Sequence, residues 1–261
     1  MKVVILCGGK GTRLREETEF RPKPMVPIGD RPILWHIMKT YAQQGHKEFI
    51  LCLGYKGEMI KEYFRNYLWM TSDVTLKLGR EAAVDFRDHH DEEDWCVSLA
   101  GTGENTLTAG RIRRIKRYIG DDEHFLLTYG DGVGNVDIDA SIAFHRQHGK
   151  LLTLTAVHPP GRFGELGLAQ DQAVMGFNEK PQAEGGWING GYFVASRGIF
   201  DYLPEGSDQI MFEQEPMQRL VSDGQLAAYP HTGFWQPMDT FQEFTLLNRL
   251  WDEGNAPWKT W

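Results

Sequence analysis

Near the start of the chain, a glycine-rich turn is followed by a group of basic residues. Gly8, Gly9 and Gly11 come directly after residues 3–7, which are all apolar and mostly β-branched. Because glycine has no side chain, the backbone N–H groups of such a turn can come close to a phosphate. The basic residues that follow are Arg13, Arg15, Arg21 and Lys23. They form a cationic segment in a chain whose formal net charge is −8, and this segment favours phosphate binding.

Lys23 is the cation best suited to aim at a ligand, because it stands between Pro22 and Pro24. A proline ring fixes its own φ angle and restricts the residue before it, so the backbone around this lysine is stiff. The alternative is a solvated surface loop in which nearby glutamates neutralise the charge. The order of apolar strand, glycine turn and constrained lysine favours the phosphate-binding interpretation.

Two aspartates are candidate metal ligands. Asp131 lies between two glycines directly after an apolar strand, and Asp239 lies at a junction between a strand and a helix. A magnesium site is typically made of one or two carboxylates together with phosphate oxygens. The alternatives are structural, because Asp-Gly is a common hairpin turn and an aspartate before a helix is a common N-cap. Spacing alone does not separate the two roles of Asp239.

The second half of the chain contains short polar motifs that suit a sugar phosphate. Glu179 and Lys180 precede a proline, and Asn189 and Gly190 follow the next short strand. An acid, an amide and glycines that permit close approach could hold a polyol while the lysine binds its phosphate. Each motif alone could be a turn, and Glu179 with Lys180 could be a surface pair of little energetic value.

The elements that must position these groups alternate between strand and helix. Apolar runs and amphipathic spacing predict strands over 3–7, 48–53, 125–129 and 151–157, and helices over 30–44, 57–67 and 139–148, the first capped by Asp30. This order is typical of a Rossmann-like α/β fold with a mostly parallel sheet and helices on both faces. Ligands of such sheets bind beyond the carboxyl ends of the strands, which is where the glycine turn falls.

Residues 68–110 interrupt this alternation and predict a small β insertion. Residues 74–78 and 95–99 read as two paired strands around a polar run. His89 and His90 in that run could suggest a metal site, but adjacent residues of a strand point to opposite faces, so solvated surface is favoured. Thr108 is expected to cap the following helix, and Arg111 is the helix cation expected nearest to a ligand.

The chain length of 261 residues fits one α/β domain over 1–261, with a C-terminal helix and aromatic tail over 240–261. Trp251, Trp258 and Trp261 in this tail predict docking onto the core or onto another subunit. A composition with more acidic than basic residues argues against nucleic-acid binding. Three scattered cysteines suit neither a disulfide framework nor a zinc motif and predict a reducing, cytoplasmic setting. No apolar run is long enough to span a membrane.

The glycine turn matches neither of two common nucleotide-binding motifs. A Walker A loop needs a lysine followed by serine or threonine, and a dinucleotide fingerprint needs a third glycine or an alanine where Leu14 stands. GGKGTRL followed by RPKPM instead resembles the sugar-1-phosphate nucleotidylyltransferases. RPILWHIM, YGDGV, PPGRFG, EKP, NGGYF, FWQPMDT and APWKTW extend the resemblance over nearly the whole chain, to the glucose-1-phosphate cytidylyltransferase family.

The resemblance implies a nucleotidyltransferase fold of the glycosyltransferase-A type and a magnesium-dependent reaction. In this family, CTP and α-D-glucose 1-phosphate give CDP-glucose and pyrophosphate, a step in dideoxyhexose and O-antigen biosynthesis, and the enzyme is a homohexamer. Carried over to this sequence, the resemblance assigns the nucleotide to Leu6, Gly8, Gly9, Gly11, Thr12, Arg13, Lys23, Thr102, Arg111 and Gly130. It assigns the sugar phosphate to Gly164, Glu179, Lys180, Asn189 and Gly190, the metal to Asp131 and Asp239, and catalysis to Arg13, Lys23 and Asp131.

The residue chemistry is consistent with that reaction. A sugar phosphate is already an anion, so its attack on a nucleotide needs alignment and charge compensation more than proton transfer. The chain offers no convincing Ser-His-Asp or Cys-His set, which disfavours a covalent intermediate. Two alternatives stay open at this stage: a uridylyl- or thymidylyltransferase for a related sugar phosphate, and a nucleotide-sugar-binding module without catalysis.

Overall fold

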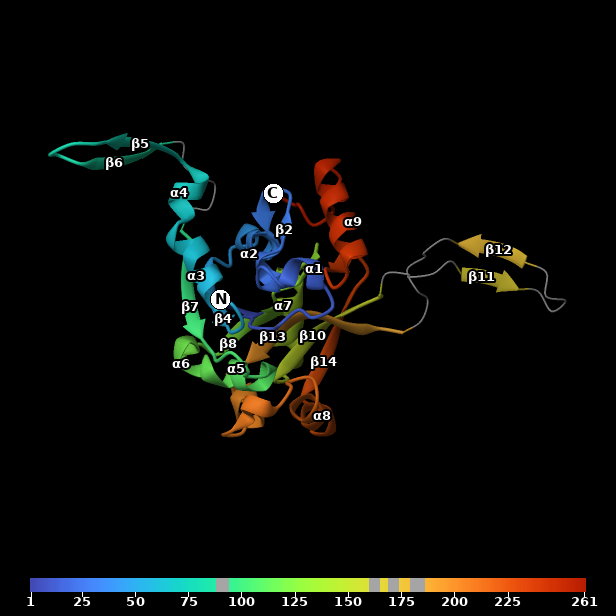
Figure 1. Cartoon of the computed structure of the whole chain (residues 1–261). Coiled ribbons are helices and arrows are strands. Elements are labelled where there is room, and N and C mark those ends of the chain that lie inside the picture. Colours follow the sequence, from blue (N-terminus) through green and yellow to red (C-terminus); the bar gives the residue numbers. More distant parts are fainter. Residues whose placement is uncertain (88–93, 160–164, 169–173, 179–185) are drawn as a thin grey trace.

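A seven-stranded mixed sheet forms the centre of the computed structural model, which describes residues 1–87, 94–159, 165–168, 174–178 and 186–261 (Figure 1). The strand order is β14-β10-β13-β8-β1-β4-β7. Only β13 runs antiparallel to its two neighbours in this sheet, and the other neighbouring strands are parallel to one another. The strands are β1 (Lys2–Cys7), β4 (Glu48–Leu53), β7 (Cys96–Gly101), β8 (His124–Tyr129), β10 (Leu152–Val157), β13 (Ile188–Ser196) and β14 (Leu226–His231). The α/β class and the mostly parallel sheet predicted from the sequence are confirmed.

Alternate residues of β1 belong to two separate hydrophobic cores, one on each face of the sheet. Val3 and Ile5 face one core, and Val4 and Leu6 face the other. Successive side chains of a strand point to opposite faces, so a strand covered on both sides must be apolar throughout. This explains why residues 3–7 lack polar alternation and why helices lie on both faces of the sheet.

The first core is covered by α2 (Ile33–Gln43), α3 (Gly57–Arg65), α7 (Ile138–His148) and α9 (Phe241–Asp252), and the second by α5 (Thr108–Arg114), α6 (Lys116–Ile119) and α8 (Glu215–Ser222). Short elements complete the chain: α1 (Arg15–Thr18), α4 (Tyr67–Thr71), the 3-10 helices η1 (Lys23–Met25), η2 (Arg197–Tyr202) and η3 (Ser207–Gln209), and the paired strands β2 (Pro27–Ile28) with β3 (Arg31–Pro32) and β11 (Glu165–Leu168) with β12 (Val174–Asn178).

Two predicted helix caps are wrong. The helix expected to begin at Asp30 begins at Ile33, because Asp30 lies in the turn between β2 and β3. Thr108 is the first residue of α5 and not its cap, which is Leu107. The Thr108 hydroxyl instead donates a hydrogen bond to Glu213 Oε2 at 2.7 Å and accepts one from the backbone N–H of Phe212 at 2.7 Å.

The predicted β insertion is present but spans fewer residues than expected, and one of its two paired strands was predicted wrongly. The strand β5 (Asp73–Lys77) pairs with β6 (Ala83–Arg87), and this hairpin projects from the body of the protein beyond α4 (Figure 1). The second strand expected in that pair is β7, which lies parallel to β4 at the edge of the main sheet. Its pairing with a distant strand is a tertiary interaction, so local pattern does not reveal it. His89 and His90 lie outside the described residues.

The C-terminal tail packs on the protein's own core. Trp258 is fully buried, and its indole N–H contacts His36 Nδ1 at 3.4 Å. Trp261 lies edge-on to Trp35, with ring centroids 5.8 Å apart. Aromatic pairs in this geometry add to the free energy of burial. Of the two docking partners expected from the sequence, the structure shows the core for these residues.

Candidate active site

The glycine turn after β1 is held open by α1. The Thr18 hydroxyl is a hydrogen-bond donor that lies within reach of two backbone carbonyl oxygens, Gly11 O at 2.9 Å and Leu14 O at 2.8 Å. Gly11 has a φ of +61°, a left-handed conformation that glycine adopts without steric cost. Apart from Gly9 itself and its two chain neighbours, no heavy atom lies within 4 Å of the point where a Cβ of Gly9 would be, so the space beside this part of the turn is open.

Arg111 holds the start of the glycine turn, at Gly8, through hydrogen bonds. Its side chain is buried and donates hydrogen bonds to Gly8 O at 3.0 Å, Leu53 O at 3.1 Å and the Thr102 hydroxyl at 2.8 Å. A Cβ at Gly8 would lie 2.1 Å from the guanidinium carbon, so Gly8 must be glycine to admit this arginine. Arg111 therefore ties together the carboxyl ends of β1, β4 and β7. Burial lowers the pKa of Arg111, but an arginine remains charged under ordinary conditions.

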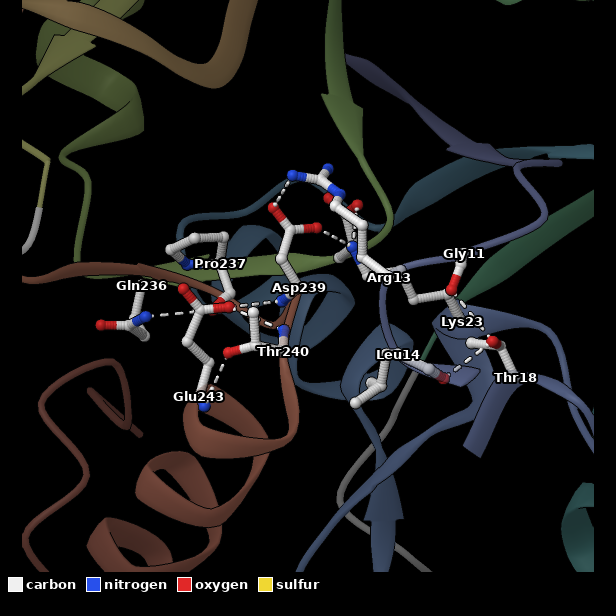
Figure 2. Close-up of polar contacts among 11 residues, drawn as sticks. Gly11, Arg13, Leu14, Thr18, Lys23, Gln236, Pro237, Asp239, Thr240 and Glu243 are labelled. Atoms are coloured by element: carbon white, nitrogen blue, oxygen red, sulfur yellow. Dashed lines mark hydrogen bonds and ion pairs between the residues drawn. The ribbon is translucent and has the colours of Figure 1, made fainter. Parts of the chain in front are cut away.

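Lys23 lies between the two predicted metal ligands. Its ammonium group donates a hydrogen bond to Asp131 Oδ2 at 2.7 Å and another to Asp239 Oδ1. Arg13 pairs with the second oxygen of Asp239 at 2.9 Å (Figure 2). The Lys23 side chain is 8% exposed and that of Arg13 is 70% exposed, so the lysine is enclosed while the arginine reaches solvent. We call Arg13, Lys23, Asp131 and Asp239 the charged quartet.

A short antiparallel pair brings the two aspartates together. The strand β9 (Gly132–Gly134) begins directly after Asp131, and β15 (Trp235–Pro237) ends two residues before Asp239. Gly132 pairs with Pro237, and the backbone N–H of Met238 donates to Asp131 O at 2.8 Å. Because the strands are antiparallel, the start of β9 and the end of β15 meet at one edge. Residues far apart in the sequence thus become neighbours at the carboxyl end of β8.

The N-terminus of α9 holds the backbone of Asp239. Glu243 Oε2 accepts hydrogen bonds from the N–H groups of Asp239 at 2.7 Å and Thr240 at 2.9 Å, and the Thr240 hydroxyl accepts one from Glu243 N–H at 3.3 Å (Figure 2). This is a capping box with Thr240 as the N-cap. The alternative role of Asp239 as the helix cap is therefore wrong, and its carboxylate is left for the charged quartet.

The electrostatics of the quartet keep Lys23 charged. Burial by itself would lower the pKa of Lys23, but the charges and hydrogen bonds of Asp131 and Asp239 outweigh it and raise the pKa above its ordinary value. A charged lysine and two carboxylates stabilise one another at this position, which the protein partly shields from solvent. The site therefore holds two cations and two anions close together and close to the glycine turn.

A cavity of about 650 Å³ opens at this edge of the sheet. Most of the predicted nucleotide and metal residues line it: Leu6, Gly8, Gly9, Gly11, Thr12, Arg13, Lys23, Arg111, Gly130, Asp131 and Asp239. Thr102 does not line the cavity; it is buried, and its hydroxyl accepts a hydrogen bond from Arg111. Asn189 and Gly190 do not line the cavity; they lie in the first part of β13, where Asn189 pairs with Ala156 of β10. Gly164, Glu179 and Lys180 lie outside the described residues, so their roles stay predictions.

Several lining residues were not identified from the sequence. Tyr129, Gln209 and Met211 form part of the wall, together with the segment 104–108. Tyr129 donates its hydroxyl hydrogen to Glu213, which also binds Thr108, so one carboxylate joins β8, α5 and the segment after η3. Tyr129 belongs to the YGDGV stretch that carries the family resemblance, whereas Gln209, Met211 and Glu213 lie in no motif recognised in the sequence. The capping box at Thr240 and Glu243 did have a sequence signal, the Thr-x-x-Glu spacing before an amphipathic helix.

The donor set of Asp131 and Asp239 fits a hard divalent cation. Both carboxylates contact one ammonium group, so both can reach one small ion beside the glycine turn. The part of the chain described by the structure contains no group of three or more His, Cys, Asp or Glu side chains with metal-binding geometry. Two carboxylates without further protein ligands suit Mg²⁺, which usually keeps waters or phosphate oxygens in its coordination sphere. Among the described residues, no helix is both long and apolar enough to cross a membrane.

Comparison with known proteins identifies the family of this chain. The family model for nucleotidyl transferases matches residues 2–251. The chain is 52% identical over 262 residues to a glucose-1-phosphate cytidylyltransferase of Salmonella typhimurium, with all of both chains covered. It is 47% identical over 261 residues, again with both chains covered, to a probable glucose-1-phosphate cytidylyltransferase of Bacillus subtilis.

Solved structures share the fold at low sequence identity. HddC from Yersinia pseudotuberculosis superposes with a TM-score of 0.67 at 24% identity, covering 96% of this chain and 99% of the other. A UDP-glucose pyrophosphorylase complexed with UDP-glucose superposes with a TM-score of 0.67 at 15% identity, covering 97% and 98%. The chain therefore belongs to the nucleotidyl transferase family and, within it, to the glucose-1-phosphate cytidylyltransferases.

Proposed function

We propose that this protein transfers the cytidylyl group of CTP to α-D-glucose 1-phosphate, giving CDP-glucose and pyrophosphate. One observation carries the proposal: the glycine turn, the two cations Arg13 and Lys23 and two carboxylates all line one cavity. The full-length identity of 52% to a glucose-1-phosphate cytidylyltransferase supports the choice of base and sugar.

The reaction is a direct displacement at the α-phosphorus of the nucleotide. A phosphate oxygen of the sugar phosphate forms the new bond, the bond from the α-phosphorus to the bridging oxygen breaks, and pyrophosphate leaves with that oxygen and its electron pair. No proton has to move, because the attacking group is already ionised. The protein must align two polyanions and compensate the charge that grows on the leaving group.

The residues of the cavity suit these two tasks. The backbone of Gly8, Gly9 and Gly11 would lie against the nucleotide, with Thr12 at its phosphates. Arg13 and Lys23 would bind the phosphates where charge accumulates. Arg111 would position the turn, because it holds Gly8 through the backbone carbonyl. These roles suit phosphoryl-transfer chemistry, in which positioning and charge compensation supply most of the catalysis.

The cofactor in this proposal is Mg²⁺, held by Asp131 and Asp239. When bound, such an ion polarises phosphate oxygens and offsets their charge. The sugar phosphate would be held by Gly164, Glu179, Lys180, Asn189 and Gly190. Of these, Asn189 pairs with Ala156 of β10, and Gly190 precedes Gly191, where a Cβ would lie 2.5 Å from the Tyr129 ring.

Pyrophosphate release tests the proposed function. Purified protein is incubated with Mg²⁺ and glucose 1-phosphate, and CTP, UTP, dTTP, ATP and GTP are offered in separate reactions. Release with CTP alone, with CDP-glucose as the second product, is the expected outcome. A preference for UTP or dTTP would assign the protein to another base. Binding of CDP-glucose without turnover of any nucleotide would overturn the catalytic proposal in favour of a binding module.

We also infer a cytoplasmic location and a homo-oligomer, a hexamer by resemblance to the family. The exposed apolar side chains of α4 and the projecting β5–β6 hairpin support an oligomer, because patches of this kind often mark interaction surfaces. They are Leu68, Trp69, Met70, Leu76, Leu78 and Val84. The mass of the purified protein in solution, measured by light scattering, decides the number of subunits.

A further inference from the structure

Lys23 occupies the position between the two carboxylates that a metal ion would need. Its ammonium group lies 2.7 Å from Asp131 Oδ2 and also binds Asp239 Oδ1, and it is enclosed by the protein. Arg13 takes the remaining oxygen of Asp239. In the free protein, three of the four carboxylate oxygens of these two aspartates therefore have a cationic partner.

An ammonium group and a divalent cation cannot share this position favourably. Mg²⁺ binds its oxygen ligands at about 2.1 Å, so it would lie next to the Lys23 nitrogen if both kept the same carboxylates. Two cations that close together repel each other, and repulsion is strong where protein excludes water. A metal ion can bind Asp131 and Asp239 only after Lys23 has moved away from them.

A nucleotide offers what Lys23 needs in order to move. Lys23 and the glycine turn line the same cavity, so phosphate oxygens bound at the turn would lie within reach of the lysine. The charged quartet is balanced, with two cations and two carboxylates. A divalent ion alone would leave an excess of two positive charges, whereas a triphosphate brings the negative charge that accommodates the ion, Lys23 and Arg13 together.

We propose that Lys23 acts as a place-holding cation, which keeps the divalent metal out of the nucleotide-free site and makes metal binding depend on bound nucleotide phosphates. This inference rests on the proposed function, because it takes the nucleotide and metal sites from it. Its consequence is an order of events: the metal enters with the nucleotide or after it. Lys23 is then a positioning residue before binding and a phosphate ligand afterwards.

Mn²⁺ binding without nucleotide tests the inference. Mn²⁺ prefers carboxylate oxygens as Mg²⁺ does, and its free concentration can be followed by electron paramagnetic resonance. The wild-type protein should bind Mn²⁺ weakly at this site. Lys23→Met should bind one Mn²⁺ at least about tenfold more tightly, because the competing ammonium is gone. This gain runs opposite to the loss expected if Lys23 only supported the site.

Three control variants separate place-holding from net charge. Arg13→Met removes one positive charge from the quartet but leaves Lys23, so it should tighten Mn²⁺ binding much less than Lys23→Met. Lys10→Met removes a charge from the cavity wall without touching either carboxylate and should match the wild type. Lys23→Met combined with Asp131→Asn should lose the gain. Equal gains in Lys23→Met and Arg13→Met would overturn the inference and indicate a simple effect of net charge.

CTP binding in the presence of EDTA distinguishes the two proposals. Wild-type protein that binds CTP but shows no gain of Mn²⁺ affinity in Lys23→Met or Lys23→Gln contradicts the place-holding role alone. Protein that binds CTP neither in EDTA nor with Mg²⁺ contradicts the proposed function. The glutamine variant and a circular dichroism spectrum of each protein ensure that a folding defect is recognised.

Discussion

Opposite ends of β8 carry two polar clusters of contrasting design. At the carboxyl end, the charged quartet surrounds a cavity and is held by ion pairs. At the amino end, three histidines and two hydroxyls form a chain of neutral hydrogen bonds through His148, Thr153, His145, Ser196 and His124. We call this chain the histidine relay. One cluster can exchange its partners for a ligand, whereas the other is saturated by its own members.

The direction of the histidine relay follows from one backbone donor. Lys150 N–H donates to His148 Nδ1 at 2.9 Å, so the neutral ring carries its hydrogen on Nε2 and donates it to Thr153 Oγ1 at 2.7 Å. The Thr153 hydroxyl can then donate to His145 Nδ1 at 2.8 Å, and His145 Nε2 can donate to Ser196 Oγ at 2.9 Å. The Ser196 hydroxyl completes the relay by donating to His124 Nδ1 at 3.2 Å. Every ring accepts one bond, so the relay requires neutral histidines.

Polar groups that maintain the fold therefore differ from those that are available for chemistry. Buried polar groups stabilise a protein when all of them are paired, and the relay meets that condition. In the charged quartet each charged group also has a partner, but the partners of the carboxylates are cations that phosphates attract. A substitution at the carboxyl end should therefore affect turnover, and one at the amino end should affect stability.

Asp131→Asn should produce the largest effect. Removing this carboxylate takes away a proposed metal ligand and one partner of Lys23, so turnover should fall by about 100- to 1000-fold or more. Pyrophosphate release measures the loss, and the thermal midpoint should change little because Asp131 is partly exposed. Asp121→Asn, which breaks an exposed pair with Arg197, serves as the matched control and should keep full activity. Substantial turnover in Asp131→Asn would refute the metal role.

Lowering the pH should reduce the stability of the folded protein through His145, which belongs to the histidine relay. Burial, followed by the nearby His124, His148 and Arg146, lowers the pKa of His145 from 6.5 to about 4. The unfolded chain therefore takes up a proton at a pH where the folded chain does not, so stability falls as the pH drops from 6.5 towards 4. The contribution of His145 over this range is about 2 kcal/mol.

Urea unfolding at several pH values measures this dependence. His145→Gln cannot titrate, so its stability should decline less steeply between pH 6.5 and 4.5 than that of the wild type. At pH 7.5 it should be less stable, by about 1–2 kcal/mol, because relay hydrogen bonds are lost. An unchanged pH slope in the variant would show that the relay tolerates a charged His145. The CTP affinity at pH 7.5 should match the wild type in either case.

Glu243→Ala should give a smaller effect that links stability to turnover. Glu243 accepts the N–H of Asp239, so its loss should free the backbone of a proposed metal ligand and lower kcat by about tenfold. Thr240→Ala removes the other half of the capping box at a similar cost in stability, about 1 kcal/mol, but leaves the bond to Asp239. Greater loss of kcat in Glu243→Ala, with partial rescue by Glu243→Gln, is the expected result. Equal kcat in both alanine variants would assign Glu243 to helix stability alone.

Local sequence was a good guide to the strands and to the residues around the glycine turn. The predicted strand over 48–53 coincides with β4, and the strand over 3–7 lies within β1. A strand buried on both faces needs an uninterrupted apolar run, and the tight turn after β1 needs glycines, so both leave a contiguous signature. Lys23 was also identified locally, from its flanking prolines. Position and residue type also pointed to Asp131, Asp239 and Arg111, whereas Leu6, Thr12, Thr102 and Gly164 came from the family resemblance alone.

Long-range pairing was not visible in the same way. The strand β7 was assigned to a hairpin because its partner β4 lies far earlier in the sequence. Glu213 was missed because its contacts with Tyr129 and Thr108 join segments that share no local motif. Arg111 was expected near a ligand, but its hydrogen bonds to Gly8, Leu53 and Thr102 became apparent only in the folded chain.

The sequence by itself determined the fold class, the glycine turn and the family, because each is recorded in contiguous residue types and spacing. Only the tertiary structure decided that Lys23 lies between Asp131 and Asp239, since that arrangement depends on the pairing of β9 with β15 and on the capping box of α9. Whether a carboxylate caps a helix, binds a metal or pairs with a lysine depends on its neighbours in space. Those neighbours come from segments more than 100 residues apart, since the Lys23 and Asp131 pair alone has a separation of 108.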